Sequence, residues 1–323
     1  METPAHWLGV KVIAIEQLTP LIKRFTFERL NGQDFPAFAA GSHIFLKIKA
    51  SDKSYSNTYS LMGGLTQLRY YQISVRLEEN GEGGTKFLHD QIKVGDELEV
   101  STPHNLFPLS DDPSCPHVLI AGGIGITPCM THLEALHQRQ ADYQLHYAFR
   151  APEHGALVDD LRRSVHQPHC HYYIDSEQQS LHVPTLLASL PKQSHLYVCG
   201  PQSLLDEVIW EASEQGFAPE QVHYELFTAK VPQEANAFTV VLAQSGLEID
   251  VAANQSILQA IEGHDFEVEC LCREGVCGTC ETTIVSGTAE HYDQYLDDEE
   301  KAAQKTMMIC VSRARGPKII LDL

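Results

Sequence analysis

The spacing of four cysteines near the C-terminal end constrains this chain more than any other feature. Three follow the pattern C-x4-C-x2-C and the fourth comes thirty residues later; they are Cys272, Cys277, Cys280 and Cys310. With this spacing, four thiolates can hold two irons bridged by two sulfides. Gly275 and Gly278 allow the loop to adopt positive backbone angles and to bring N–H groups towards the sulfides. The pattern predicts a [2Fe–2S] cluster and the transfer of single electrons.

These cysteines have two alternative interpretations, a zinc site and a ligand set that includes Cys270. Four cysteines also suit tetrahedral zinc, but zinc ribbons usually carry two separated C-x2-C pairs and this chain has one. Cys270 precedes Cys272 by two residues, but the x4 spacing favours Cys272 as the ligand. The odd total of nine cysteines, with no leader segment, is typical of a reducing compartment. We therefore expect a cytoplasmic protein without disulfides.

Charge and hydropathy exclude two classes of partner. The formal net charge is −20, from 43 acidic and 23 basic residues, so a nucleic-acid-binding surface is not expected. Because no run of eighteen apolar residues occurs, a membrane span is not expected either.

The pattern of short apolar runs predicts three domains. Residues 1–110 contain β-branched and aromatic runs broken by Gly and Pro, as in a small antiparallel barrel. Residues 111–228 alternate apolar strands with helical patterns, which indicates a parallel α/β sheet. A polar stretch at 229–237 is the predicted linker, and residues 238–323 carry the cysteine motif.

A glycine-rich turn follows the first predicted strand of the α/β domain. The sequence Gly122-Gly123-Ile124-Gly125 leads into a helix that Thr127 is expected to cap, and such a turn lets backbone approach a pyrophosphate. Alone the motif is weak, because strand–helix turns often carry glycine for packing. Cys199-Gly200-Pro201 ends a later strand, and strand ends on one edge of a parallel sheet converge on one ligand crevice. Together they predict a dinucleotide site.

The predicted barrel carries a third motif. Tyr59 and Ser60 lie side by side, where a ring and a hydroxyl can flank a flavin and bond its edge. Gly84 and Thr85, at a predicted helix start, would hold a phosphate. Tyr59 alone would more often be a half-buried barrel residue, but the three motifs together favour a flavin.

These motifs, in this order, resemble the phthalate dioxygenase reductase family over essentially the whole chain. Residues 56–61, 76–80, 101–107 and 269–280 resemble, within it, reductases that serve carnitine oxygenases. The resemblance implies FMN on the barrel, a nicotinamide cofactor on the α/β domain and a C-terminal plant-type ferredoxin domain of β-grasp fold. It also implies a monomer whose partner is a Rieske-type oxygenase. Aromatic-ring or demethylating oxygenases, of phthalate or vanillate type, are the alternative partners.

The resemblance also assigns residues. It places Ser60, Cys199 and Phe227 near the flavin and nicotinamide, with no general base or nucleophile. The remaining cofactor contacts that it implies are Tyr59, Gly84, Thr85, Gly122, Gly123, Gly125, Thr127, Gly200 and Pro201. Family members usually have Arg where this chain has Asn57, so the phosphate would depend on other groups, such as Arg76 or Lys86.

Two residues at predicted strand ends bear on the choice of nicotinamide cofactor. Asp175 is expected to close the third α/β strand, where it would accept from a ribose hydroxyl and repel a 2′-phosphate. Arg150 ends the neighbouring strand and could receive such a phosphate. The sequence favours NADH and leaves NADPH possible.

Overall fold

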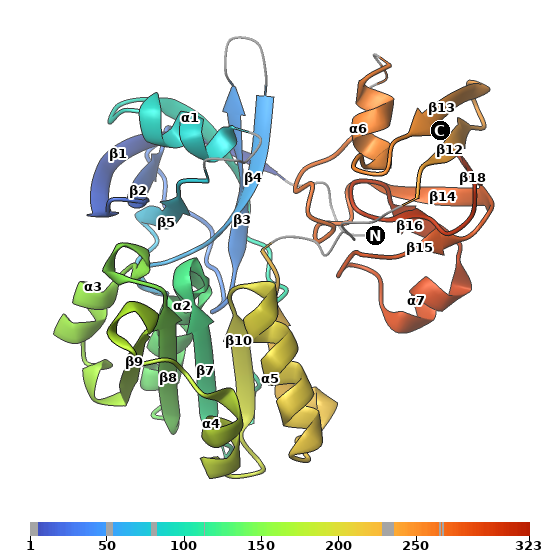
Figure 1. Ribbon diagram of the computed structural model, residues 1–323. Coiled ribbons are helices and arrows are strands. Elements are labelled where there is room, and N and C mark those ends of the chain that lie inside the picture. The colour runs from blue at the N-terminus through green and yellow to red at the C-terminus, as the bar shows by residue number, and fades with distance from the viewer. Residues whose placement is uncertain are drawn as a thin grey trace. The chain divides into compact units, whose positions relative to one another are not determined.

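The computed structural model describes residues 6–49, 54–78, 83–112, 114–227, 236–264, 266 and 268–323. The chain forms two compact units, Met1–Leu226 and Phe227–Leu323. The first unit contains both the antiparallel and the parallel sheet, and the second contains the cysteine motif (Figure 1). Most of the predicted 229–237 linker lies outside the described residues, and the boundary at 110 stays a prediction.

An antiparallel sheet of order β4-β3-β6-β1-β2-β5 forms the first half of unit 1. Its strands are β1 (Trp7–Thr19), β2 (Ile22–Arg29), β3 (His43–Lys49), β4 (Ser54–Ser60), β5 (Tyr70–Arg76) and β6 (Glu97–Ser101). A bridge between Met62 and Gln72 links the two outer strands, so the sheet curls into the expected barrel. Inward-facing residues such as Val10, Phe25 and Ile44 fill its core, and α1 (Gly84–Asp90) lies beside β4 and β5.

The second half of unit 1 is a five-stranded parallel sheet of order β11-β10-β7-β8-β9. Its strands are β7 (His117–Gly122), β8 (Tyr143–Phe149), β9 (Cys170–Ile174), β10 (His195–Cys199) and β11 (Val222–Glu225). Its helices are α2 (Ile126–Gln138), α3 (Val158–Arg163), α4 (Val183–Ser189) and α5 (Gln202–Glu214). The short 3-10 turns are η1 (Gly123–Gly125), η2 (Pro152–His154), η3 (Gln167–His169), η4 (Asp175–Glu177) and η5 (Pro219–Gln221). The chain runs outward from β7 through β8 to β9 and then returns to β10 on the other side of β7. The carboxyl ends of β7 and β10 therefore form the switch point at which such sheets bind ligands.

Unit 2 is a mixed sheet of order β13-β12-β18-β14-β16 with a helix against it. The elements are β12 (Phe238–Leu242), β13 (Leu247–Val251), α6 (Ile257–Glu262), β14 (Glu281–Ser286), β15 (Ala289–Glu290), α7 (Asp298–Ala303), β16 (Thr306–Met308), β17 (Arg313–Ala314) and β18 (Lys318–Leu321). The β12–β13 hairpin is antiparallel, whereas β12 and β18 are parallel. Ser256 caps α6 in a reciprocal box with Gln259, and Ile257 and Ile261 then enter the core.

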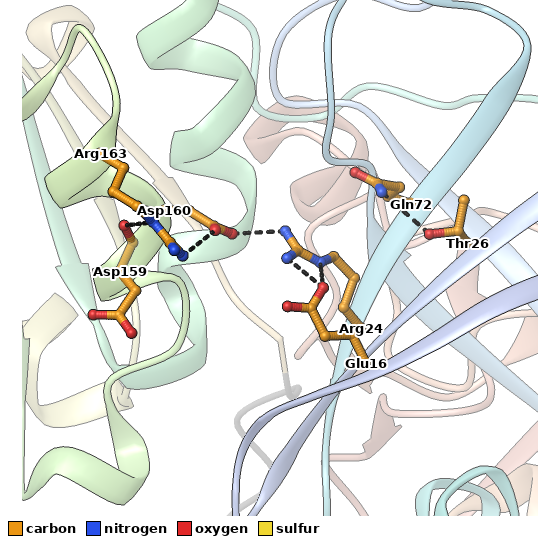
Figure 2. Close-up of polar contacts among 7 residues, drawn as sticks. All are labelled: Glu16, Arg24, Thr26, Gln72, Asp159, Asp160 and Arg163. Atoms are coloured by element: carbon orange, nitrogen blue, oxygen red, sulfur yellow. Dashed lines mark hydrogen bonds and ion pairs between the residues drawn. The ribbon is translucent and has the colours of Figure 1, made fainter.

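An ion-pair network joins the barrel to the parallel half of unit 1 (Figure 2). On the barrel, Arg24 of β2 bonds Glu16 of β1 through Nη2, 2.6 Å from Oε2. Its Nη1 lies 2.6 Å from Oδ2 of Asp160 on α3, and Arg163 approaches the other oxygen of Asp160 at 3.6 Å. Arg24 therefore binds two carboxylates from different halves of the unit.

Replacement of Arg24 by Met is expected to lower the free energy of unfolding of unit 1 by about 2 kcal/mol, because two carboxylates lose a charged donor. Urea unfolding followed by circular dichroism would measure it. Arg163→Met is the matched control, since the Arg163 side chain is 76% exposed and its loss should cost at most about 0.5 kcal/mol. Equal losses in the two variants would contradict the assigned role of Arg24.

Candidate functional site

The predicted cluster loop adopts the positive backbone angles that its glycines predict. Gly275 has φ +70° and Gly278 has φ +74°, and Arg273 also adopts a positive φ of 58°. A Cβ on Gly278 would lie 2.3 Å from the ring of Tyr295, so only glycine fits there. The loop is held beside α6 by Arg273, whose guanidinium pairs with both oxygens of Glu262 at 2.5 and 3.0 Å.

Five cysteine sulfurs converge on this loop. Those of Cys270, Cys280 and Cys310 all lie within 4.8 Å of one another. The sulfur of Cys272 accepts hydrogen bonds from the thiols of Cys277 and Cys310. The predicted ligands are therefore brought together, and Cys270, the alternative to Cys272 as a ligand, lies with them. Such a set of thiols fits an iron–sulfur cluster.

Two backbone donors distinguish Cys272 from Cys270. Its Sγ accepts hydrogen bonds from the N–H groups of Glu274 and Val276, both at 3.4 Å. Bonds from the Cys277 and Cys310 thiols and from these N–H groups hold the pKa of Cys272 well below its usual range. The thiols of Cys280 and Cys310 also lower the pKa of Cys270. The ligand set Cys272, Cys277, Cys280 and Cys310 stays a prediction.

Strand β4 presents the predicted flavin contacts. Among the described residues, the buried hydroxyls of Ser56, Thr58, Tyr59 and Ser60 have no hydrogen-bond partner in the protein. Ser56, Thr58 and Ser60 project from one face of β4, whereas Tyr59 projects from the other face and packs against the barrel core. A row of three buried hydroxyls without partners is what a polar ligand would satisfy, so these three residues fit a flavin edge, and the role of Tyr59 stays a prediction. Burial raises the pKa of Tyr59, which keeps its phenol neutral.

The predicted phosphate contacts lie at the start of α1. Gly83 precedes α1 with φ +104°, and a Cβ on Gly84 would come within 2.5 Å of the Asn57 side-chain oxygen. Asn57 therefore lies against the helix start, as its place in the motif requires. The Thr85 hydroxyl already accepts a hydrogen bond from the backbone N–H of Glu78.

The two cations suggested in place of the missing arginine have other partners in the structure. Arg76 lies 3.5 Å from Glu78, and exposed Lys86 lies 3.9 Å from Asp90. The buried Nε of Arg76 has no hydrogen-bond partner in the protein, so the role of Arg76 at a phosphate stays a prediction.

The strand ends of β7 and β10 meet as the two glycine motifs predict. A Cβ on Gly125 would lie 2.2 Å from the carbonyl oxygen of Cys199, and Gly122 lies against Gly200 and Pro201. These glycines are required by the close approach of the two turns. Gly123, with φ +55° and nothing within 4 Å of its Cβ position, is the one that leaves space for a ligand.

Thr127 does not cap α2 as expected. The helix begins at Ile126, two residues earlier than a cap at Thr127 would place it, and the Thr127 hydroxyl donates to the carbonyl of Ile124 at 3.0 Å. Because the 3-10 turn η1 runs directly into the helix, Gly125 occupies the capping position instead. Thr127 is buried, and its hydrogen bond to Ile124 stabilises the turn η1.

The strand ends of β8 and β9 hold the residues that bear on the nicotinamide cofactor. β9 ends at Ile174, so Asp175 opens the 3-10 turn after it and does not close the strand; it is exposed and accepts from Ser180 Oγ at 2.8 Å. The carbonyl of Arg150 accepts from the N–H of Ser176, so the two strand ends are adjacent. Phe227 begins unit 2 and is half-buried.

Glu225 is a site residue that the sequence motifs did not reveal. It ends β11, pairs with Cys199 in register and is 9% exposed. Burial raises its pKa to about 8. Its Oε1 lies 3.8 Å from Nδ1 of His43, the first residue of β3. A buried acid thus lies where the barrel meets the switch point of the parallel sheet.

Comparisons with known proteins agree with this geometry. Residues 9–108 match the family described as oxidoreductase FAD-binding domain, and residues 240–315 match the 2Fe-2S iron-sulfur cluster binding domain. Phthalate dioxygenase reductase, a solved structure, is 32% identical with a TM-score of 0.77, covering 98% of both chains. The chain belongs to the phthalate dioxygenase reductase family. Members of this family with higher identity are the carnitine monooxygenase reductase subunits of Acinetobacter baumannii, 53% identical over 97% of this chain and 96% of the relative, and of Escherichia coli, 46% identical over 97% and 98%.

Family membership confirms the predicted fold class and the redox chemistry. The chain is an oxidoreductase with a flavin-binding barrel, a parallel α/β half and a C-terminal [2Fe–2S] domain. Among the described residues, no helix is long and apolar enough to cross a membrane.

Proposed function

We propose that this chain is the reductase component of a two-component Rieske oxygenase, using NADH and FMN, and that its oxygenase partner acts on carnitine. The observation that carries the reductase role is the convergence of the cysteine sulfurs in a chain that also has a flavin-binding barrel. The choice of carnitine rests on the relatives named above, which match over nearly their full length.

The chemistry that the bound groups would supply is electron splitting, since a flavin accepts two electrons as a hydride and releases them singly to a cluster. The protein positions these groups. Tyr59 and Ser60 would line the flavin edge, and the space at Gly123 would admit the dinucleotide. Burial raises the pKa of Cys199 well above its usual value, so Cys199 would stay a neutral thiol beside the nicotinamide and would not act as a nucleophile.

FMN, and not FAD, is the proposed flavin. The resemblance to the phthalate dioxygenase reductase family supports FMN. The turn at Gly83 and Gly84 also supports it, because this turn places backbone N–H groups of the α1 start beside β4. Chromatography of the flavin released by acid would test this proposal. Recovery of FAD would contradict it.

NADH is the proposed electron donor. A cavity of about 410 Å³ lies among the β1–β2 turn, α3 and the ends of β8 and β9. Four acidic residues and two arginines line it: Glu16, Asp159, Asp160, Glu177, Arg162 and Arg163. An excess of carboxylates beside the exposed Asp175 disfavours the additional phosphate of NADPH.

Asp175→Ser is expected to raise the ratio of NADPH to NADH turnover, because it removes a carboxylate from the predicted ribose position. Steady-state kcat/KM with each cofactor would measure the ratio. Glu220→Ser, a change at another exposed acid, is the control. An unchanged ratio in Asp175→Ser would contradict the assignment of this residue.

The experiment for the function as a whole combines the purified protein with a carnitine oxygenase component, NADH, oxygen and L-carnitine. Trimethylamine formed in step with NADH loss would support both the role and the substrate. NADH-dependent reduction of cytochrome c without trimethylamine would keep the reductase role and overturn the carnitine assignment.

A further inference from the structure

Three side chains form a row on one face of the barrel, next to the parallel sheet. His43 pairs directly with Ser60 across β3 and β4, and an antiparallel bridge joins His43 to His104 on its other side. Directly paired residues of antiparallel strands project their side chains to the same face. Ser60, His43 and His104 are therefore consecutive neighbours.

The middle residue of this row contacts the buried acid of the parallel sheet. His43 Nδ1 lies 3.8 Å from Glu225 Oε1, with the two side chains 3% and 11% exposed. The other ionisable groups that face Glu225 are the thiols of Cys199 on β10 and Cys129 on α2, both buried. Those thiols stay neutral because burial raises their pKa, so the imidazole is the one base beside Glu225 among these groups.

The far end of the row reaches towards solvent. His104 is half-buried, and its ring is stacked on that of His43 at 6.1 Å between centroids, with 20° between planes. One water molecule can span such a separation between ring nitrogens. Phe45, which is 1% exposed, packs against both rings and keeps the row dry on that side.

The proposed function requires that a proton leave this region. NADH gives up a hydride, which is two electrons and one proton, and becomes NAD⁺. The cluster takes only the two electrons, one at a time, so one proton per NADH must be released to water. Ser60, at the predicted flavin edge, is the buried end of the row.

We infer that His43 relays this proton from the Ser60 hydroxyl to His104 and so to solvent, with Glu225 holding the His43 ring. The Ser60 hydroxyl would give its proton to His43 as it takes one from the reduced flavin, His43 would then give a proton to His104, and His104 would give one to water. At each transfer one bond to hydrogen breaks as another forms, so Ser60 and both rings end in their starting forms. This inference rests on the proposed function.

The test uses the cofactor-loaded protein in weakly buffered solution with a pH-indicator dye. NADH and excess cytochrome c are mixed with it in a stopped-flow instrument, so that flavin reduction, electron release and proton release are timed separately. The variants are His43→Gln and His104→Gln. His166→Gln is the matched control, because His166 is also buried but bonds Tyr143 in the parallel half.

Flavin reduction by NADH is expected to keep its rate in both relay variants, while proton and electron release slow about tenfold or more with a larger solvent deuterium isotope effect. In flavin-free protein, infrared titration should show that His43→Gln moves the pKa of the Glu225 carboxyl upward, since the carboxylate loses the imidazole that lies 3.8 Å from it. The control should match the unaltered protein in all readouts.

Unchanged release rates and isotope effects in both variants would overturn the relay. Should His43→Gln lose its flavin, His104→Gln decides alone, because His104 is not among the predicted flavin contacts. A failure of NADH to reduce the flavin of the unaltered protein would contradict the proposed function itself.

Discussion

Replacement of Cys272 by serine is expected to abolish the [2Fe–2S] cluster, whereas the same change at Cys270 is expected to leave it in place. Five sulfurs converge at this site and a cluster needs four. The x4 spacing and the two backbone donors to its Sγ select Cys272. Those N–H groups stabilise the negative charge of a bound thiolate, whereas the Cys270 thiol has one backbone donor, the N–H of Arg273.

Iron and labile sulfide per protein, with the visible absorption spectrum, would measure the outcome. The two variants are a matched pair, because both residues are cysteines of the same loop. Loss of the cluster in Cys270→Ser with retention in Cys272→Ser would contradict the predicted ligand set.

Replacement of Arg313 by Met is expected to lower the free energy of unfolding of unit 2 by about 3 kcal/mol. This arginine is 2% exposed, and its guanidinium donates to three backbone carbonyls, those of Gln255, Ala252 and Asn236. It also lies over the ring of Phe238, 5.0 Å from its centroid. One side chain thereby ties β17 to the start of β12 and to the loop that leads into α6. Methionine would leave those carbonyls without their donor.

Urea unfolding followed by the loss of cluster absorption would report on unit 2. Arg313→Lys should lose less, because an ammonium can still donate to some of the carbonyls. Arg315→Met, at an exposed position two residues away, should change stability by at most about 0.5 kcal/mol. Equal destabilisation by Arg313→Met and Arg315→Met would contradict this role.

Much of the fold could be predicted because the strands that build it carry apolar runs. The parallel strands at 117–122, 143–149 and 195–199 contain valine, leucine, isoleucine and aromatic residues. Their alternation with helices along the chain indicates a parallel sheet. Strand β4 was not delimited, because Ser-Tyr-Ser-Asn-Thr-Tyr-Ser has no aliphatic residue and alternates tyrosine with small polar groups. Strand β11 was missed because four residues are too few for a periodic signal.

The candidate site, like the fold, could be predicted only in part. Motifs that depend on local backbone geometry, such as the turn at Gly122–Gly125 and the loop around Gly278, could be predicted because glycine is required there. His43 and Glu225 could not, since their contact joins residues far apart in the chain and neither belongs to a spaced motif. The convergence of Cys270 with the predicted ligands is likewise a tertiary property of the loop.

The proposed function is the passage of electrons from NADH through a flavin to a [2Fe–2S] cluster within this one chain. Anaerobic addition of one equivalent of NADH to the purified protein, followed by absorption and electron paramagnetic resonance spectroscopy, tests it most directly. We expect bleaching of the flavin followed by the signal of a reduced [2Fe–2S] cluster. A colourless protein that contains zinc, or a flavin that NADH reduces without any cluster signal, would contradict it.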